Sequence, residues 1–242
     1  MEIEIASCSC KGGRDYNEDC VQYLEKDGVC AVVVADGLGG HGGGQIASSV
    51  VAEFITGAFM YSPEIKEKNI STIFEQANDA VLSSQTAEKK MKSTAVALFI
   101  GGGAIIWGHV GDSRLYHFKD GALIGQTLDH SVSQMAVFSG EIEQWQIRRH
   151  ADRNRVLRAC GVDEGFKPEV AGVYKPGPGF NAFLLCTDGF WEYVLELEME
   201  VGLVKAETPH DWIRGMVGRL ARSVPPDNDN FSAAAVFLRV ES

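Results

Sequence analysis

The stretch CAVVVADG, residues 30–37, is an apolar run that ends abruptly in an aspartate and a glycine. Its unbroken apolar character predicts a strand that is buried on both faces. The same pattern recurs where WGHV leads into Gly111-Asp112 and where FLLCT leads into Asp188-Gly189. A mirrored case is DNDN at 227–230, which stands just before the run SAAAVFL.

These carboxylates at strand ends predict a cation site. A single Asp-Gly pair after a strand is usually a turn, but the recurrence of the pattern points to a shared purpose. A strand end holds a carboxylate rigidly, and the adjacent glycine lets a ligand or a backbone carbonyl come close. Several anions at neighbouring strand ends would repel one another unless a cation lay among them. Oxygen ligands of this kind suit Mg²⁺ or Mn²⁺ rather than Zn²⁺.

Strand-like and helical patterns surround the central run. Strands are expected from Ile3 and from Cys20, and helical spacing of apolar residues predicts helices at Gln45 to Met60 and at Ile70 to Ala87. The runs TAVALFI, AIIWGHV and SRLYHF within 94–118 predict an antiparallel meander, since three glycines separate the first two.

The second half of the chain is more mixed. Short helical pieces such as Glu141 to Ile147 are followed by the strand-like runs VAGVY, NAFLLC and SAAAVFLRV. The clearest helix begins at Thr208, whose hydroxyl can cap it, with Pro209 at the first helical position. Strands grouped around helix pairs predict an α+β layered domain, and no linker or repeat divides residues 1–242 into further domains.

Composition excludes several classes of protein. The 242 residues include 22 Lys and Arg against 33 Asp and Glu, which gives a formal net charge of −11. Such a chain repels polyanions, so nucleic acid is not an expected partner. No apolar run approaches the roughly 18 to 20 residues of a membrane helix, and the start MEIEIASCSC is unlike a signal peptide. We therefore expect a cytoplasmic protein, not bound to membranes, with reduced cysteines.

Short motifs that follow one another in a familiar order resemble those of the metal-dependent PP2C-type (PPM) protein serine/threonine phosphatases, in the compact bacterial form. They are RDYNED at 14–19, VADGLGGHGGGQIAS at 34–48, KSTAVA at 92–97, GDSRLY at 111–116, LDHS at 128–131, HADRNRVLRACG at 150–161, CTDGFWE at 186–192 and DNFS at 229–232. The resemblance spans nearly the whole chain. It implies a PP2C-like four-layer sandwich, in which two central antiparallel β-sheets are flanked by pairs of helices, with a dinuclear Mn²⁺ or Mg²⁺ centre at one end.

The resemblance also implies the metal ligands. Asp36 would bridge the two ions, Gly37 would offer its backbone carbonyl, and Asp112 would help to hold a third, weaker ion. The remaining ligands, some of them acting through water, would be Glu18, Asp19, Asp188 and Asp229.

Two further residues are candidates for the chemistry at the phosphate. Arg14 is the expected phosphate clamp, because its fork pairs two oxygens at once; the alternative is a surface salt bridge to Asp15 or Glu18. The leaving alkoxide needs a proton, and animal relatives have a histidine directly after the Asp-Gly pair. This chain has Leu38 there and its nearest histidine is His41. His41 as the acid, His41 as a loop or substrate contact, and metal-bound water as the acid all stay open.

The segment at about 132–160 corresponds to the flap that borders the cleft in such enzymes. Its arginines would form a basic patch that favours phosphopeptides, although Arg155 and Arg158 are equally expected to pair with internal acids. These arginines are Arg148, Arg149, Arg153, Arg155 and Arg158.

The expected function is hydrolysis of phosphoserine and phosphothreonine in proteins by a water that bridges two metal ions, in opposition to a Ser/Thr kinase. The expected partners are phosphorylated proteins, and the expected state is a monomer. Alternatives are a phosphoprotein-binding pseudophosphatase, a metal-dependent phosphodiesterase or nuclease, and a cysteine-dependent phosphatase built on Cys8 and Arg14. The intact set of carboxylates argues against a pseudophosphatase, and the negative net charge argues against a nuclease. The strand-like surroundings of Cys8 argue against a cysteine-dependent phosphatase.

Overall fold

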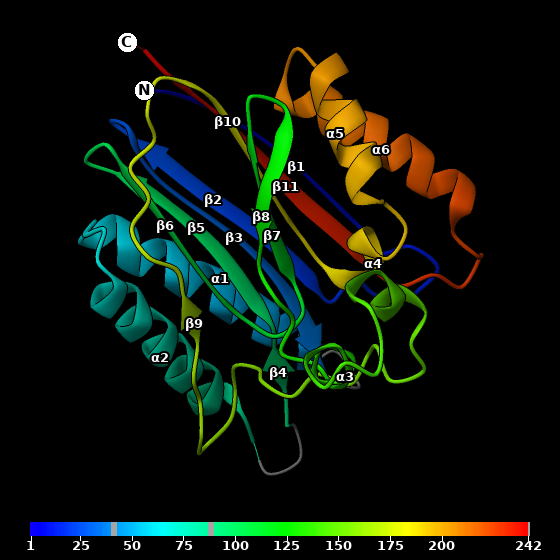
Figure 1. Ribbon diagram of the computed structural model, residues 1–242. Coiled ribbons are helices and arrows are strands. Elements are labelled where there is room, and N and C mark those ends of the chain that lie inside the picture. Colours follow the sequence, from blue (N-terminus) through cyan, green and yellow to red (C-terminus); the bar gives the residue numbers. More distant parts are fainter. Residues whose placement is uncertain (40–42, 87–89, 242) are drawn as a thin grey trace.

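In the computed structural model, which describes residues 1–39, 43–86 and 90–241, two antiparallel β-sheets lie face to face (Figure 1). One sheet has the order β1-β11-β10-β7-β8 and the other β2-β3-β5-β6-β9, with β4 beside β3. The strands of the first are β1 (Glu2–Cys10), β7 (Arg114–Lys119), β8 (Ala122–Gln126), β10 (Gly179–Cys186) and β11 (Phe231–Val240). Those of the second are β2 (Asp19–Lys26), β3 (Val29–Leu38), β4 (Lys92–Ser93), β5 (Ala95–Gly101), β6 (Ala104–Val110) and β9 (Glu169–Val170).

A pair of helices covers the outer face of each sheet (Figure 1). Helices α1 (Gly43–Tyr61) and α2 (Glu67–Ser84) pack on the sheet that contains β3, whereas α5 (Glu196–Lys205) and α6 (Pro209–Ser223) pack on the sheet that contains β11. The shorter helices are α3 (Val132–Phe138), the 3₁₀ helix η1 (Gln144–Arg149) and α4 (Asp188–Trp191). The predicted α+β four-layer sandwich is confirmed.

The central run of β3 is buried on both faces, as the sequence predicts. Successive side chains of a strand point to opposite faces, so Val32 and Val34 enter the core between the sheets, while Ala31 and Val33 enter the core beneath α1. This strand therefore joins two of the three hydrophobic cores.

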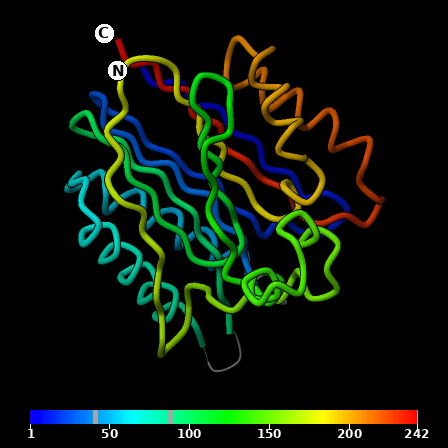
Figure 2. The backbone as a smooth tube through the Cα atoms, viewed as in Figure 1, coloured from blue at the N-terminus to red at the C-terminus, as the bar shows by residue number. Residues whose placement is uncertain are grey.

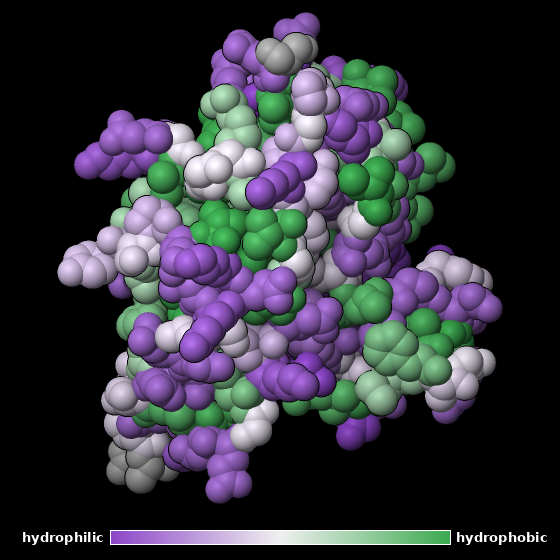
Figure 3. Space-filling model, turned by 60° about the vertical axis from the view of Figure 1, so that its left-hand side comes forward, coloured by the Kyte–Doolittle hydropathy of each residue, from purple (hydrophilic) through white to green (hydrophobic). Residues whose placement is uncertain are grey.

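The two ends of the described chain belong to one sheet. Strand β1 pairs with β11 along its whole length, and Glu2 lies opposite Arg239. Figure 2 shows the blue and red ends of the tube side by side. On the face shown in Figure 3, hydrophilic side chains predominate and hydrophobic ones form separate clusters. Among the described residues, none of the helices has the length and apolar composition needed to cross a bilayer.

Several predicted elements have the expected form. Strands β5 and β6 form the predicted hairpin, whose turn uses Gly102 and Gly103 at φ +56° and +78°. Helix α6 begins as predicted: the Thr208 hydroxyl accepts a hydrogen bond from the Asp211 amide at 3.1 Å, and Pro209 is the first helical residue.

Three predicted elements differ from the structure. The strand-like run VAGVY at 170–174 contributes only Val170 to β9 and an isolated bridge from Tyr174 to Ile105. The reason is that its middle residues, Gly172 and Val173, are exposed.

Strand β7 does not continue the meander, because it lies in the other sheet and pairs with β8 and β10. The chain changes sheet at Gly111, whose φ of +102° suits a sharp turn. The helix expected at Glu141 to Ile147 is instead the 3₁₀ helix η1 at Gln144–Arg149. This segment is short and buries only the side chain of Ile147, so it lacks the apolar face that would stabilise a longer α-helix.

Phe183 tests the core between the sheets, where its side chain is fully buried. Phe183→Ala should lower the free energy of unfolding by about 3 to 5 kcal/mol, because the lost contacts leave a cavity. Phe138→Ala is the matched control, since this ring is 62% exposed, and should change the same quantity by less than about 0.5 kcal/mol. Urea denaturation measures both, and equal effects would contradict the assignment of this core.

Candidate active site

The ends of strands from both sheets meet at one end of the sandwich. Asp19 opens β2 and lies opposite Asp36 near the end of β3. Asp188 follows β10, and Asp229 precedes β11. Asp36, Asp188 and Asp229 border a cleft of about 600 Å³. The predicted site residues that line this cleft are Arg14, Glu18, Asp36, Gly37, Asp112, Asp188 and Asp229.

The two other predicted site residues stand apart from that lining. Asp19 lies beside the cleft with its side chain buried. His41 lies outside the residues that the structure describes, so its proposed role as general acid stays a prediction.

Backbone hydrogen bonds fix Asp36 in place. Its amide donates to the Thr94 hydroxyl at 3.0 Å, and its carbonyl accepts from the Thr94 amide at 2.9 Å. The next residue, Gly37, donates from its amide to the Glu18 carbonyl at 3.1 Å. A Cβ atom on Gly37 would lie 2.1 Å from the carbonyl oxygen of Gly44 in α1. Glycine is therefore required at 37, because the strand end and the first turn of α1 touch.

Asp188 and Asp229 are held by their own neighbouring amides. The Gly189 amide donates to Asp188 Oδ1 at 2.6 Å, and the Asn230 amide donates to Asp229 Oδ1 at 2.8 Å. A Cβ atom on Gly189 would lie 2.0 Å from the Asn230 carbonyl oxygen, so the two segments are in direct contact. This contact brings two carboxylates together that are far apart in sequence.

Arg14 forms an ion pair with Asp229 rather than with Asp15 or Glu18. Its Nη2 donates to Asp229 Oδ2 at 2.8 Å, and both side chains are partly exposed at the cleft. An exposed ion pair of this kind contributes little to the stability of the fold. Its main consequence is that it places the Arg14 guanidinium beside the carboxylates of the cleft.

Asn230 organises the loop that carries these residues. Its Nδ2 donates to the carbonyls of Lys11 and Tyr16 at 2.8 and 2.9 Å, and its Oδ1 accepts from the Glu18 amide at 2.8 Å. Asn230 belongs to the DNFS motif but had no predicted role. Because an amide side chain can both donate and accept, an asparagine among the aspartates was the available signal.

Asp19 provides direct support for a cation. Its Oδ2 accepts from the Thr187 hydroxyl at 2.9 Å, but its Oδ1 is buried and has no hydrogen-bond partner among the described residues. A buried carboxylate oxygen without a partner is costly unless something of opposite charge binds it. Burial raises the pKa of Asp19 to about 7, and the nearby carboxylates of Asp229 and Glu18 add to the shift.

The other carboxylates repel one another in the same way. Burial raises the pKa of Asp36 well above its usual range, and among the neighbouring charges that of Asp188 raises it most. Burial likewise raises the pKa of Asp188, with the charge of Asp112 next. Divalent cations with oxygen ligands would relieve this repulsion, so the residues present fit a Mg²⁺ or Mn²⁺ centre.

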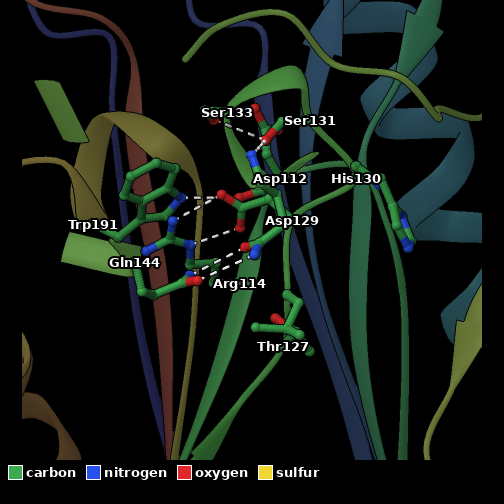
Figure 4. A network of polar contacts seen from close by, with 12 residues as sticks. Asp112, Arg114, Thr127, Asp129, His130, Ser131, Ser133, Gln144 and Trp191 are labelled. Atoms are coloured by element: carbon green, nitrogen blue, oxygen red, sulfur yellow. Dashed lines mark hydrogen bonds and ion pairs between the residues drawn. The ribbon is translucent and has the colours of Figure 1, made fainter. Parts of the chain in front are cut away.

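Asp112 sits against a buried network that the sequence analysis missed (Figure 4). Arg114 makes two hydrogen bonds of 2.7 Å to Asp129, and its guanidinium lies 3.5 Å from the centre of the Trp191 ring. The Trp191 Nε1 in turn donates to the Asp112 carbonyl at 2.9 Å. Burial and the charge of Asp129 raise the pKa of Asp112 to about 7. The signal was present in GDSR and LDHS, but sequence does not reveal which charges pair.

A second group of possible ligands does not form a comparable site. His109 Nε2 lies 2.8 Å from the Leu128 carbonyl oxygen, and the Gly111 amide donates to His130 Nδ1 at 3.1 Å. These bonds place a proton on Nε2 of each ring, and His130 Nε2 then faces Glu169 at 3.4 Å. A cation at His130 Nε2 would have to displace that proton. Burial lowers the pKa of both histidines, which favours two neutral stacked rings.

The flap lies beside the cleft, and most of its arginines are paired. Asn154 and Val156 line the cleft directly. Arg155 bonds to Asp152 within the flap, which matches the internal pairing expected for it. Arg158, for which the same was expected, is exposed and has no acidic partner within 4.0 Å in the part of the chain that the structure describes. Arg148 and Arg153 bond to Glu196 and Glu192 from the neighbouring helical segment. These pairs neutralise much of the expected basic patch.

Known proteins are similar to this chain in sequence and in fold. Residues 9–223 match the family model described as Protein phosphatase 2C. The serine/threonine phosphatase stp of Listeria monocytogenes is 35% identical over 196 residues, which cover 77% of each chain. The PPM Ser-Thr phosphatase MsPP from Mycobacterium smegmatis, in complex with cacodylate, has 26% identity and a TM-score of 0.81, covering 96% of this chain and 97% of that one. The catalytic domain of PstP in complex with two manganese ions has 24% identity and a TM-score of 0.82 over 99% of both chains.

The crowded carboxylates predict how stability depends on pH when no divalent cation is bound. The pKa values of Asp19 and Asp112 are about 7 in the fold, whereas an unfolded aspartate titrates near pH 3.9. The folded chain therefore holds protons that the unfolded chain has released. From pH 5 to pH 8 in EDTA, the free energy of unfolding should fall by roughly 5 kcal/mol, about half of it from each of these two carboxyls.

Urea denaturation at several pH values measures this slope. Asp19→Asn should make it shallower, because asparagine does not titrate, and added Mn²⁺ should remove most of it. A free energy of unfolding that rises over the same pH range would refute the electrostatic account.

Proposed function

The chain belongs to the protein phosphatase 2C family, and on this premise we propose that its cleft removes phosphate from phosphoserine and phosphothreonine in proteins. The observation that carries the proposal is the group of partly or fully buried carboxylates from distant segments, with Asp19 Oδ1 lacking a partner among the described residues. That arrangement is costly for the protein and is useful if cations bind there.

We propose that two divalent cations, Mn²⁺ or Mg²⁺, bind in this cleft. The charges of Asp188 and Asp19 both raise the pKa of Asp36, so we propose Asp36 as the residue shared by the two cations. The residues proposed to hold the two cations, directly or through water, are Glu18, Asp19, Asp36, Gly37, Asp188 and Asp229. Asp112 would hold a third, weaker ion. The two manganese ions of the PstP catalytic domain, which shares this fold, support the proposal.

Cations held by these residues would supply a water molecule activated for attack on phosphorus at neutral pH. Arg14 stands at the cleft, where its guanidinium can pair with the phosphate oxygens that point away from the carboxylates. Without cations, the raised pKa values of Asp36 and Asp188 keep protons on the opposite side of the cleft, and bound cations would replace those protons with positive charge that attracts the phosphate. The proton for the leaving hydroxyl is proposed to come from His41 or from solvent in the cleft.

The alternatives are weaker. Cys8 lies within β1, and burial raises the pKa of its thiol to about 11, whereas a cysteine-dependent phosphatase needs a thiolate. A pseudophosphatase would lack part of the carboxylate set, but every predicted carboxylate is present at the site. A nuclease would need to attract a polyanion, which the net charge of −11 opposes. We propose phosphorylated proteins as substrates and an opposing Ser/Thr kinase.

Loss of the metal centre should abolish the activity. Asp36→Asn is expected to reduce kcat on a phosphothreonine peptide by at least about 1,000-fold, comparable with the loss of a central catalytic group. EDTA should do the same to the unmodified protein, and Mn²⁺ should restore it. Asp163→Asn, at an exposed position outside the cleft, is the control. Full activity of Asp36→Asn, or indifference to EDTA, would overturn the proposal.

Arg14 should act chiefly on substrate binding. Arg14→Ala should raise KM for the phosphopeptide by about 10- to 100-fold, the range expected for lost hydrogen bonds to a charged group. Arg14→Lys should recover only part of this loss, because lysine keeps the charge without the fork. Steady-state kinetics separates KM from kcat. An unchanged KM in Arg14→Ala would show that Arg14 serves only its ion pair with Asp229.

A further inference from the structure

A second groove lies next to the catalytic cleft. It has a volume of about 620 Å³ and runs between η1 and the residues that connect α4 to α5. Its apolar side chains are unusually open to solvent: Trp145 and Leu197 are each 69% exposed, and Leu195 is 49% exposed. An exposed aromatic ring beside leucines is the kind of surface that anchors a bound polypeptide.

The groove has one cation at its edge that is not neutralised. Arg148 bonds to Glu196 at 2.8 Å, and Arg153 bonds to Glu192 at 2.6 Å. Arg149 is exposed and has no acidic partner within 4.0 Å among the described residues. The chain has a net charge of −11, so an unpaired positive charge such as that of Arg149 differs from its acidic surroundings. This guanidinium is available to pair with a carboxylate of a bound partner.

The groove adjoins the catalytic cleft, because a third hollow shares lining residues with both. A smaller hollow of about 180 Å³ lies between them, with Arg14, Asp188 and Asp229 on its lining. The same hollow is also lined by Arg153 and Glu192, which border the groove as well. A chain that places its phosphorylated residue at the carboxylates can therefore extend past the Arg153 to Glu192 ion pair into the groove.

We propose that this groove binds the stretch of a phosphoprotein substrate that flanks the phosphorylated residue, and that it selects stretches with an apolar side chain and a carboxylate. The apolar side chain packs against Trp145 and Leu197, and the carboxylate pairs with Arg149. Trp145 and Arg149 are thus specificity determinants that take no part in the chemistry. The inference rests on the proposed phosphatase function, because it describes how that site chooses its substrates.

The test compares substrates that differ only in the flanking residues. One phosphothreonine peptide carries Leu and Glu on one side, a second carries Ala and Gln at the same positions, and p-nitrophenyl phosphate has no flank. Both peptides are made with the varied residues before or after the phosphothreonine. The unmodified protein should show about tenfold higher kcat/KM for the Leu and Glu peptide in one of the two placements.

Variants then assign the preference to the groove. Arg149→Ala and Trp145→Ala should each remove most of it while leaving p-nitrophenyl phosphate hydrolysis unchanged. Arg155→Ala is the matched control, since this arginine is also exposed in the flap but does not line the groove. High ionic strength should reduce the share of the peptide preference that depends on Arg149, because salt screens its charge. The share that depends on Trp145 should persist.

The possible outcomes separate two failures. If the unmodified protein hydrolyses both peptides equally in both placements, or if the variants lower turnover of all three substrates in parallel, the groove proposal is overturned. If p-nitrophenyl phosphate is hydrolysed but neither phosphopeptide is, the proposed protein phosphatase function itself fails. Selective loss in Arg149→Ala and Trp145→Ala but not in Arg155→Ala supports the groove.

Discussion

Mutual repulsion among carboxylates at the strand ends is the constraint on which the site depends. Asp36 and Asp188 come from opposite sheets, and the pKa of each is raised by burial and by neighbouring negative charge. The fold keeps them together because their backbones are fixed by the sheets and by the close approach at Gly37 and Gly189. The inter-sheet core therefore holds charges in an arrangement that they would otherwise leave. Such strain at a functional site is maintained by stability supplied elsewhere.

The same repulsion links cation binding to phosphate recognition. Asp229 Oδ2 accepts a hydrogen bond from Arg14, and Asp229 is also a proposed cation ligand. A cation at that carboxylate would withdraw its negative charge from Arg14, so more of the guanidinium becomes available to a phosphate. One carboxylate would thus serve both functions. The ordering of events follows from charge: cations in the cleft would add the positive charge that, together with Arg14, attracts an anionic substrate.

Local patterns in the sequence predicted the α+β class and the aspartates at strand ends, whereas the four-layer sandwich and the places of Arg14 and Glu18 at the cleft were expected from the family resemblance. The apolar run of β3 and the capped start of α6 are short-range signals, and both have the predicted form. The sequence did not show which of the two sheets β7 joins. An apolar strand can lie in either sheet, and the choice depends on the turn at Gly111. The pairing of Arg114 with Asp129 was missed for a related reason: sequence lists charges, but only the packed chain shows which ones meet.

The flap shows why this distinction matters for function. Its arginines suggest a broad basic surface when they are counted along the chain. In the structure, Arg148 and Arg153 are bound to glutamates of the α4 and α5 segment, which ties the flap to the body of the protein. These two arginines are therefore structural, and Arg149 is left to face solvent near Trp145. Recognition by one cation and one aromatic ring is narrower than recognition by a basic patch, because a substrate must satisfy both a charge and a shape.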